Sequence, residues 1–377
     1  MTSSSHSAAS PPASRIPVGI RCAQDYETLA RQSMAAPSHA YIAGGSGHGL
    51  TAAANRAAFA RWAIQPRLLR DVGAGHTRVA LAGAPFMHPL LLAPVAFHKL
   101  AHPAGELETA RAAHATDTCL IASTLSSCTL EDVARAAGPQ RWFQLYFQAR
   151  REATLDLLRR AEAAGYGAIV VTLDAPIQVA SLGALDLQFQ MPPECVAVNL
   201  LEHPVPPAMQ LAPGESRIFQ GVMRGAPTWD DLAWLLAQAT VPVWVKGVMH
   251  PDDALALRAA GVAGVVVSNH GGRSLDGAPA SLDALISIRA ALGPDFPLLF
   301  DGGIRSGADL FKALALGANA AAVGRLQLYA LSVAGALGVA HMIKLLLEEL
   351  EVCMALAGCA TVDRIGPAAL TTTHFPC

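Results

Sequence analysis

Residues 241–273, VPVWVKGVMHPDDALALRAAGVAGVVVSNHGGR, contain the repeating unit from which the fold can be predicted. The apolar run 241–248 is typical of a buried strand, and residues 252–260 follow with the apolar spacing of a helix. Two aspartates lie in the first turn of this helix, where the helix dipole favours acidic side chains. A second apolar run, 264–269, comes next. The stretch therefore predicts two parallel strands joined by a helix.

The same alternation extends in both directions and gives eight strand and helix units. The predicted strands are 90–93, 119–123, 142–147, 168–174, 241–248, 264–269, 297–301 and 320–324. The predicted helices are 106–115, 130–137, 153–164, 229–238, 252–260, 281–292, 308–316 and a long one at 334–357. Parallel strands that are buried on both faces are continuously apolar, as these are. Because eight units close a (β/α)8 TIM barrel, we expect this α/β fold in preference to an open doubly wound sheet.

Three segments lie outside this repeat. Residues 1–15 are rich in Ser, Ala and Pro and lack the apolar segment of a signal peptide, so we expect a disordered leader. Residues 16–88 predict an N-terminal helical cap with a small β element. Residues 177–226 form a long insertion after the fourth strand, and we expect a lid over the barrel mouth. Residues 16–377 are thus expected to form one barrel domain.

Composition narrows the class of protein. The chain of 377 residues is 52% hydrophobic and carries a net charge of −2, which does not match a basic nucleic-acid-binding surface. Its seven cysteines are scattered without CxxC spacing, which indicates free thiols in a reducing compartment and argues against a zinc site. No uncharged apolar stretch reaches the roughly 18 residues of a membrane span. We therefore expect a cytoplasmic protein, and membrane contact through residues 177–226 is a less favoured alternative.

Polar residues stand at the ends of the predicted strands, where TIM barrels carry their active sites. Gln144 and Tyr146 share a face at the end of the third strand, and Thr172 and Asp174 do so at the end of the fourth. The other strand ends contribute Lys246, then Ser268, His270 and Arg273, then Asp301, Gly302 and Gly303, then Gly324 and Arg325. The pattern predicts a functional barrel mouth.

The glycines after the seventh and eighth strands predict a phosphate site, because that corner commonly binds phosphate in these barrels. Gly302, Gly303 and Gly324 allow backbone N–H groups to approach a phosphate closely, and Arg325 can pair with it through two hydrogen bonds. Tight turns beside an ordinary surface arginine are the alternative interpretation. The glycines at 44–47 lack a preceding strand and the dinucleotide spacing, so we expect no dinucleotide site there.

The sequence of residues 268–276, SNHGGRSLD, resembles the signature of the FMN-dependent 2-hydroxy-acid oxidase and dehydrogenase family. The resemblance spans about residues 20–365 and includes Tyr41, which is similar to the family's N-terminal tyrosine. Other matching stretches are APVA at 93–96, FQLY at 143–146, VKGV at 245–248, DGG at 301–303 and GR at 324–325. The resemblance implies FMN as cofactor, oxidation of a small L-2-hydroxy acid to the 2-oxo acid, and a homotetramer.

The expected chemistry needs a base, and His270 fills that role because imidazole accepts protons near neutral pH. Asp174 would orient His270 and stabilise its protonated form. Lys246 would stabilise negative charge on the reduced flavin. The resemblance implies that the residues near FMN are Pro94, Val95, Ala96, Ser123, Gln144, Thr172, Lys246, Ser268, Asp301, Gly302, Gly303, Arg305, Gly324 and Arg325.

An anionic substrate needs a fixed cation, and the planar guanidinium of Arg273 suits a carboxylate. Tyr41 and Tyr146 are expected to donate hydrogen bonds to the carboxylate and to the reacting oxygen.

Two positions depart from the family's pattern. Most members have an arginine-rich stretch after the fourth strand, whereas residues 177–181 read IQVAS here, with Ser181 nearest the place of a substrate-binding arginine. Loss of such a contact would weaken carboxylate binding by about 1.5–3 kcal/mol. An aromatic residue common in the family is replaced near Leu125. We therefore expect a wider, more apolar pocket than glycolate needs.

Two questions stay open at this point. The electron acceptor is either oxygen or another molecule. The alternatives to a hydroxy-acid enzyme are a flavin-binding barrel with altered or lost catalysis and a flavin-dependent isomerase.

Overall fold

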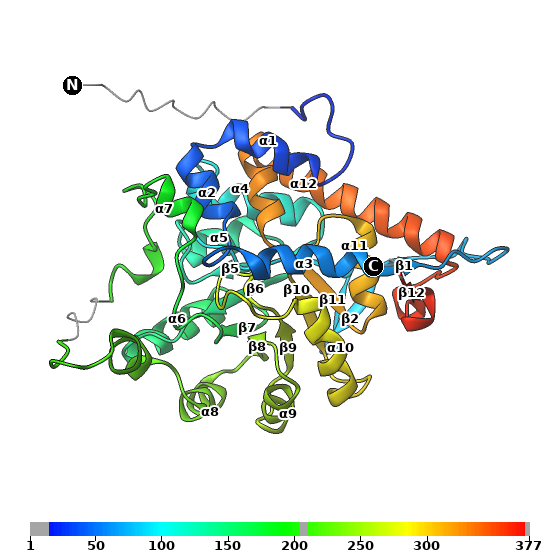
Figure 1. Cartoon of the computed structure of the whole chain (residues 1–377). Coiled ribbons are helices and arrows are strands. Elements are labelled where there is room, and N and C mark those ends of the chain that lie inside the picture. Colours follow the sequence, from blue (N-terminus) through cyan, green and yellow to red (C-terminus); the bar gives the residue numbers. More distant parts are fainter. Residues whose placement is uncertain (1–14, 204–209, 374–377) are drawn as a thin grey trace.

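The computed structural model describes residues 15–203 and 210–373, and its centre is a closed barrel of eight parallel strands (Figure 1). Each strand pairs with the next along the chain, and the last pairs with the first. The strands are β4 (Leu90–Leu92), β5 (Cys119–Ser123), β6 (Arg141–Leu145), β7 (Ile169–Thr172), β8 (Val243–Val248), β9 (Gly264–Val267), β10 (Leu298–Asp301) and β11 (Ala320–Val323). Closure confirms the expected TIM barrel, because an open sheet would have two unpaired edges.

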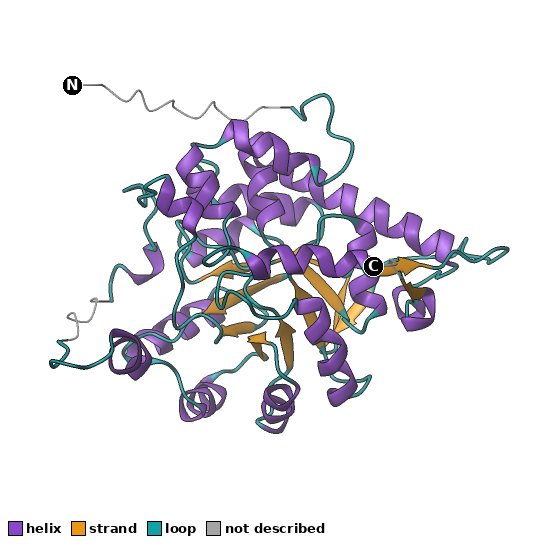
Figure 2. Ribbon diagram, in the orientation of Figure 1, coloured by secondary structure: helices purple, strands orange, loops and turns teal. Residues whose placement is uncertain are grey.

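Helices surround the barrel and follow the strands in alternation (Figure 2). They are α4 (Glu106–Ala115), α5 (Leu130–Ala136), α6 (Arg151–Ala163), α8 (Trp229–Gln238), α9 (Pro251–Ala259), α10 (Ser281–Leu292), α11 (Gly307–Ala315) and α12 (Arg325–Ala357). The expected bounds agree within two residues for every strand and for all these helices except the last. The expected start of that helix was wrong, because α12 begins directly after β11 and is interrupted at Ala334 and Gly335, where the backbone is not helical.

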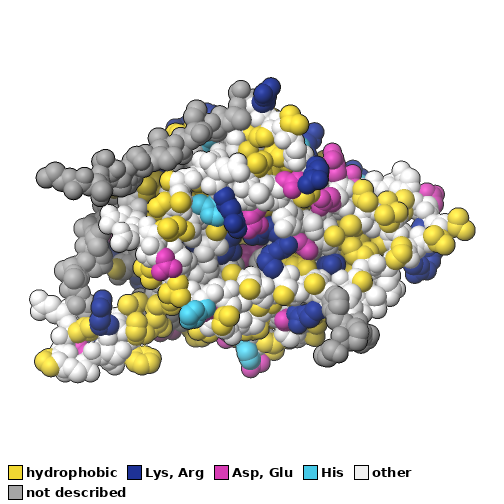
Figure 3. Space-filling view, turned by 45° about the horizontal axis from the view of Figure 1, so that its top comes forward, with side chains coloured by type: hydrophobic (Ala, Val, Ile, Leu, Met, Phe, Trp, Pro, Cys, Tyr) yellow, Lys and Arg dark blue, Asp and Glu magenta, His cyan; other side chains and the backbone are white. Residues whose placement is uncertain are grey.

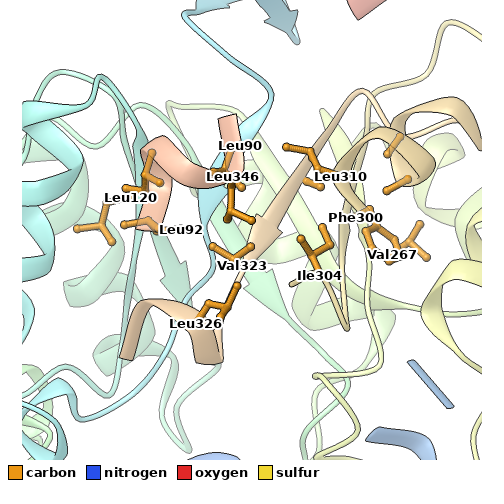
Figure 4. Close-up of a cluster of buried hydrophobic side chains, with 14 of the residues drawn as sticks. Leu90, Leu92, Leu120, Val267, Phe300, Ile304, Leu310, Val323, Leu326 and Leu346 are labelled. Atoms are coloured by element: carbon orange, nitrogen blue, oxygen red, sulfur yellow. The ribbon is translucent and has the colours of Figure 1, made fainter. Parts of the chain in front are cut away.

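Successive strand residues point to opposite sides of the barrel wall, and both sides are buried. Leu91 packs inside the barrel with Trp142 and Trp244, whereas Leu90 and Leu92 pack outward against the helices. Figure 4 shows part of the outer layer, to which strands β4, β5, β9, β10 and β11 and helix α12 contribute side chains. Burial on both sides explains why the strands are apolar without alternation.

Helix α12 is long and apolar enough to cross a membrane by length and composition alone, which differs from the expectation drawn from the sequence. However, 61% of its most apolar window is buried. It packs against α1 (Asp25–Ser33), α4 and α11. Because its apolar side chains are covered by these helices, we assign α12 to the protein core.

The N-terminal region forms the expected helical cap with a small β element. Helices α1, α2 (Ala36–Ala43) and α3 (Leu50–Ala60) precede the barrel. Strand β1 (Trp62–Ile64) pairs with β12 (Leu370–Thr372), and β2 (Val79–Leu81) forms a hairpin with β3 (Ala84–Phe86). The expected leader lies almost wholly outside the described residues.

The insertion at 177–226 lies between β7 and α8, as expected. Its described part contains α7 (Leu182–Asp186) and the short helical turns η2 (Val198–Leu200), η3 (Arg217–Gly221) and η4 (Val222–Gly225). Helix α7 lies beside α2 of the cap (Figure 1). The insertion therefore contacts the cap near the carboxyl ends of the strands.

Candidate active site

A cavity lies at the carboxyl ends of the barrel strands, and all eight strand ends contribute residues to its wall. The residues expected from the sequence that line it are Tyr41, Pro94, Val95, Ala96, Ser123, Gln144, Tyr146, Thr172, Lys246, His270, Arg273, Asp301, Gly302, Gly303, Arg305, Gly324 and Arg325. The two remaining residues, Asp174 and Ser268, lie behind the wall and form hydrogen bonds with residues of it. The fold thus brings the whole expected set to one place.

His270 and Asp174 form a hydrogen-bonded pair, with Nδ1 of the ring 2.8 Å from Oδ1 of the carboxylate. The two side chains are 17% and 9% exposed. Burial raises the pKa of Asp174, but Lys246 and His270 lower it by more, so its pKa lies below the usual value. The carboxylate accepts a hydrogen bond from Nδ1 when that nitrogen carries the proton. In the neutral ring, Nε2 is then the nitrogen that can accept a proton. The contact therefore selects the tautomer of the neutral ring whose Nε2 can accept a proton.

Gly247 explains how Asp174 comes so close to β8. A Cβ atom at position 247 would lie 2.4 Å from Cβ of Asp174, and the backbone there has φ of +103°. Such a contact excludes any side chain at this position, because real Cβ atoms do not approach other atoms so closely.

The backbone at His270 is strained. His270 has φ of +59°, which costs an ordinary residue about 1–2 kcal/mol. The conformation is held by a hydrogen bond from its N–H to Oγ of Ser268 and by one from the N–H of Gly272 to the carbonyl of Asn269. Gly272 also passes so close to α3 that a Cβ atom would lie 2.5 Å from the backbone nitrogen of Ala52. The histidine and glycine of the signature therefore form one tight turn that aims the imidazole.

Lys246 is buried and lies in a charged network. Its Nζ donates to Oγ of Ser268 at 3.0 Å and lies 3.6 Å from Oδ2 of Asp301, while Ser268 donates to Asp301 at 2.6 Å. Burial lowers the pKa of Lys246, but Asp301 and Asp174 raise it by more, so its pKa lies above the usual value. Burial also raises the pKa of nearby Tyr146 to about 12. Near neutral pH, both shifts favour a charged Lys246 and a protonated Tyr146 hydroxyl that can donate a hydrogen bond.

Arg273 is fixed to the N-terminal cap. Its Nη1 donates to the carbonyls of Tyr41 and Gly44 at 2.7 and 3.0 Å, and its guanidinium carbon lies 5.0 Å from the centre of the Tyr41 ring. Tyr41 stacks on Phe189 of the insertion with 4.4 Å between ring centres. Both hydrogens of Nη1 are used, so Nε and Nη2 remain for a ligand.

Two buried polar atoms test whether the cavity fits the ring system of FMN. Nε2 of Gln144 and Oγ1 of Thr172 have no hydrogen-bond partner among the described residues, although both residues line the cavity. Buried polar groups without partners are costly, so a polar ligand edge is expected beside them. The flavin ring has such an edge, and the wall at Pro94, Val95 and Ala96 suits its apolar face. These residues fit the flavin.

The opposite corner fits a phosphate. Gly302 and Gly303 line this corner with φ of +120° and +89°, and without side chains they allow a phosphate to approach the backbone closely. Arg325 donates to the carbonyls of Ile42, Gly44 and Gly271, so three of its five N–H groups are used and two remain. Burial lowers the pKa of Arg325 to about 10, with a smaller contribution from Arg273. A phosphate would relieve this unfavourable burial of like charges.

Sequence reasoning missed one polar residue of the wall. Gln178 lines the cavity, whereas Ser181, which the resemblance placed nearest the absent arginine, does not. Ser181 instead packs against Gly44, where a Cβ atom would lie 2.2 Å from its Oγ. The apolar residues Leu125 and Ile42 also line the cavity. Only the departure from the family's pattern at 177–181 pointed toward Gln178.

Comparison with known proteins agrees with this site. Residues 30–372 match the family model described as FMN-dependent dehydrogenase. The chain is 66% identical over 360 residues to an L-lactate oxidase of Alicycliphilus denitrificans, a match that covers 96% of this chain and 99% of that protein. It is 46% identical over 347 residues to an L-lactate oxidase of Roseobacter sp., covering 92% and 94%.

The structure of mandelate oxidase with (S)-2-phenylpropionate is similar, with a TM-score of 0.82 and 39% identity over 93% of this chain and 98% of that one. These findings confirm the family, FMN as cofactor and an FMN-dependent oxidoreductase as the class of enzyme. The roles of the individual residues stay predictions. The chain belongs to the family of FMN-dependent dehydrogenases.

Proposed function

We propose that this protein oxidises a small aliphatic L-2-hydroxy acid, with L-lactate the first candidate, to the 2-oxo acid, and that oxygen accepts the electrons. One hydroxy acid and one oxygen molecule then give one oxo acid and one hydrogen peroxide. The observation that carries this proposal is the His270–Asp174 pair in a cavity that also presents the free guanidinium edge of Arg273. The similarity to L-lactate oxidases supports the substrate and the acceptor.

His270 acts as the base in this proposal. Its Nε2 accepts the proton that the substrate loses, and the resulting imidazolium is stabilised by Asp174 at Nδ1. Because the carboxylate is only 9% exposed, the stabilisation is stronger than it would be in water. FMN, when bound, supplies the ring that takes up two electrons from the substrate carbon.

The other polar groups orient the substrate. Nε and Nη2 of Arg273 bind the carboxylate, and the Tyr41 hydroxyl donates to it. Tyr146 keeps its proton and donates to the substrate oxygen. Lys246 stays charged and offsets negative charge that develops on the flavin side of the cavity.

The insertion acts as a lid in this proposal. Gln178 lines the cavity, and Phe189 covers Tyr41. The insertion is anchored further along at buried Asn199, whose Oδ1 accepts from the backbone of Leu130 at 2.9 Å and whose carbonyl accepts from Arg160. A segment that is fixed at one place and lines the cavity at another can close over a substrate. Hydrogen exchange at 177–189 should slow when a substrate analogue binds, and unchanged exchange would argue against a lid.

The proposed reaction is tested by adding hydroxy acids to the purified FMN-loaded protein without air. Glycolate, L-lactate, L-2-hydroxybutyrate and mandelate should be compared by the loss of flavin absorbance. We expect L-lactate to reduce the flavin, and oxygen to restore its absorbance with stoichiometric hydrogen peroxide. Flavin that no acid reduces would favour a binding protein with lost catalysis, and reduced flavin that is stable in air would identify a dehydrogenase.

We also propose a cytoplasmic homotetramer. The six cysteines of the described residues are all free, which suits a reducing compartment. Hydrophobic side chains occupy several areas of the surface in Figure 3, and some, such as Phe219, are largely exposed. Burial of such side chains between copies would be favourable. Light scattering on a sizing column tests this, and a monomer at micromolar concentration would refute it.

A further inference from the structure

A second cavity, of about 270 Å³, adjoins the first beneath the insertion. Three residues line both cavities, namely Tyr41, Gln178 and Arg273. Arg273 and Tyr41 are the groups that bind the substrate carboxylate in the proposed function. Gln178 therefore stands in the wall that these two groups form.

The charges around the first cavity leave one cation for the substrate. Lys246 is paired with Asp301, and Arg305 with a glutamate of α1. Arg325 lies at the corner that fits a phosphate and is held by three carbonyls. Among the described residues, Arg273 has backbone carbonyls as partners and no carboxylate within ion-pair distance. One substrate carboxylate would balance its charge.

Gln178 adds a donor to this wall without adding charge. It is the only residue of the insertion's described part that lines the first cavity, and its amide makes no hydrogen bond to another described residue. The insertion side of the second cavity is mostly apolar and includes Val179, Leu185 and Phe189. A second anionic group placed there would have to share Arg273, which is the only cation that lines the second cavity in the described part of the chain.

We propose that Gln178 is a second contact to the substrate carboxylate, and that the neutral Gln178 together with Arg273 restricts the enzyme to 2-hydroxy acids with one carboxylate and an uncharged tail. This inference rests on the proposed function and names its substrate class. The amide N–H donates to a carboxylate oxygen beside Arg273, since each of the two oxygens can accept more than one hydrogen bond. A 2-hydroxy diacid such as L-malate is rejected because its two carboxylates would have to share the single cation Arg273.

Unreactive acids provide the first test, because their binding does not depend on turnover. Acetate, propionate and butyrate share the carboxylate and differ only in the tail. Gln178→Met keeps the length of the side chain and removes the donor. We expect the FMN-loaded variant to bind all three acids about tenfold more weakly. This factor is at the lower end of the range for a hydrogen bond to a charged group, because Gln178 is exposed. Calorimetry measures each Kd.

Turnover provides the second test. Gln178→Met should raise KM for L-lactate by a similar factor and leave kcat nearly unchanged, since the contact is the same before and during the reaction. Gln178→Arg adds a cation and should raise kcat/KM for L-malate relative to L-lactate by at least about tenfold. Gln190→Met is the matched control, because Gln190 is an exposed glutamine of the same insertion that lines neither cavity, and it should change neither quantity.

The outcomes separate the two proposals. An effect of Gln178→Met that grows with tail length would place Gln178 on the tail and overturn the inference, as would unchanged binding of all three acids. Wild-type protein that oxidises L-malate as well as L-lactate would also overturn it. Protein that binds the acids as expected but oxidises no hydroxy acid would refute the proposed function and leave the carboxylate contact standing.

Discussion

Replacing Asp174 by Asn tests the centre of the proposed chemistry. The substitution keeps the size of the side chain and an oxygen that can accept from Nδ1 of His270, but it removes the negative charge. Nδ1 of His270 lies 2.8 Å from Oδ1 of Asp174. Two full charges about 4 Å apart interact by about 4 kcal/mol at an effective dielectric constant of 20. If half of the imidazolium charge has formed in the transition state, about 2 kcal/mol is lost.

That loss corresponds to a decrease of about 30-fold in the rate of flavin reduction. The assay mixes FMN-loaded protein with L-lactate in a stopped-flow instrument without air and follows flavin absorbance. Asp174→Ala is the comparison, because it removes both the charge and the acceptor and should be slower still. Equal flavin content in all three proteins is the control for the fold. A rate within about threefold of wild type for Asp174→Asn would refute the electrostatic role of Asp174.

Four other changes have defined outcomes. Gly247→Ala should lower the free energy of unfolding, measured by urea denaturation, by about 1–3 kcal/mol, because the new Cβ would collide with Asp174. Gly225→Ala is the control, because a Cβ at that position would have no atom within 4 Å. Equal stability of the two variants would contradict the geometry. Leu125→Phe narrows the cavity and should lower kcat/KM for 2-hydroxy acids with long tails by about tenfold, with little change in kcat/KM for glycolate. Equal effects on both substrates would show that Leu125 does not contact the substrate tail. Arg273→Lys should raise KM and lower kcat for L-lactate because a point charge cannot form two parallel hydrogen bonds, and unchanged kinetics would exclude Arg273 from the site. The pKa of Asp174 is lower in the folded protein than in the unfolded chain, so the carboxylate stabilises the fold at a pH above its unfolded-state pKa. This stabilisation is lost as the pH falls through the folded-state pKa. Asp174→Asn should therefore lose less stability than wild type in acid, and parallel curves of unfolding free energy against pH would contradict this.

The barrel could be predicted from the sequence because the apolar patterns of its strands and helices are local and repeat along the chain. Each strand is buried on both faces and each helix on one, so apolar residues alternate between two distinct patterns along the chain. The bounds agree within two residues for all eight strands. The long helix α12 was the exception, because the expected helix began at residue 334, whereas α12 begins at Arg325 and is interrupted at Ala334 and Gly335.

Much of the site followed from the same regularity. Parallel strands end at one edge, so Asp174 after β7 and His270 after β9 were expected at the same mouth of the barrel, on alternate strands. The signature at 268–276 then indicated the cofactor and the reaction by resemblance. Neither argument gives the 2.8 Å contact between the two side chains, which depends on the close passage of Gly247.

Only the tertiary structure decided how the cap and the insertion complete the site. Arg273 and Arg325 both donate to the carbonyl of Gly44, more than 200 residues away in the sequence, and Tyr41 stacks on Phe189 of the insertion. It is Gln178 that lines the cavity, while Ser181 packs against Gly44. Local patterns determine strands and helices because those depend on neighbouring residues. Contacts between distant segments depend on how whole elements pack, and the sequence carries no local signal for them.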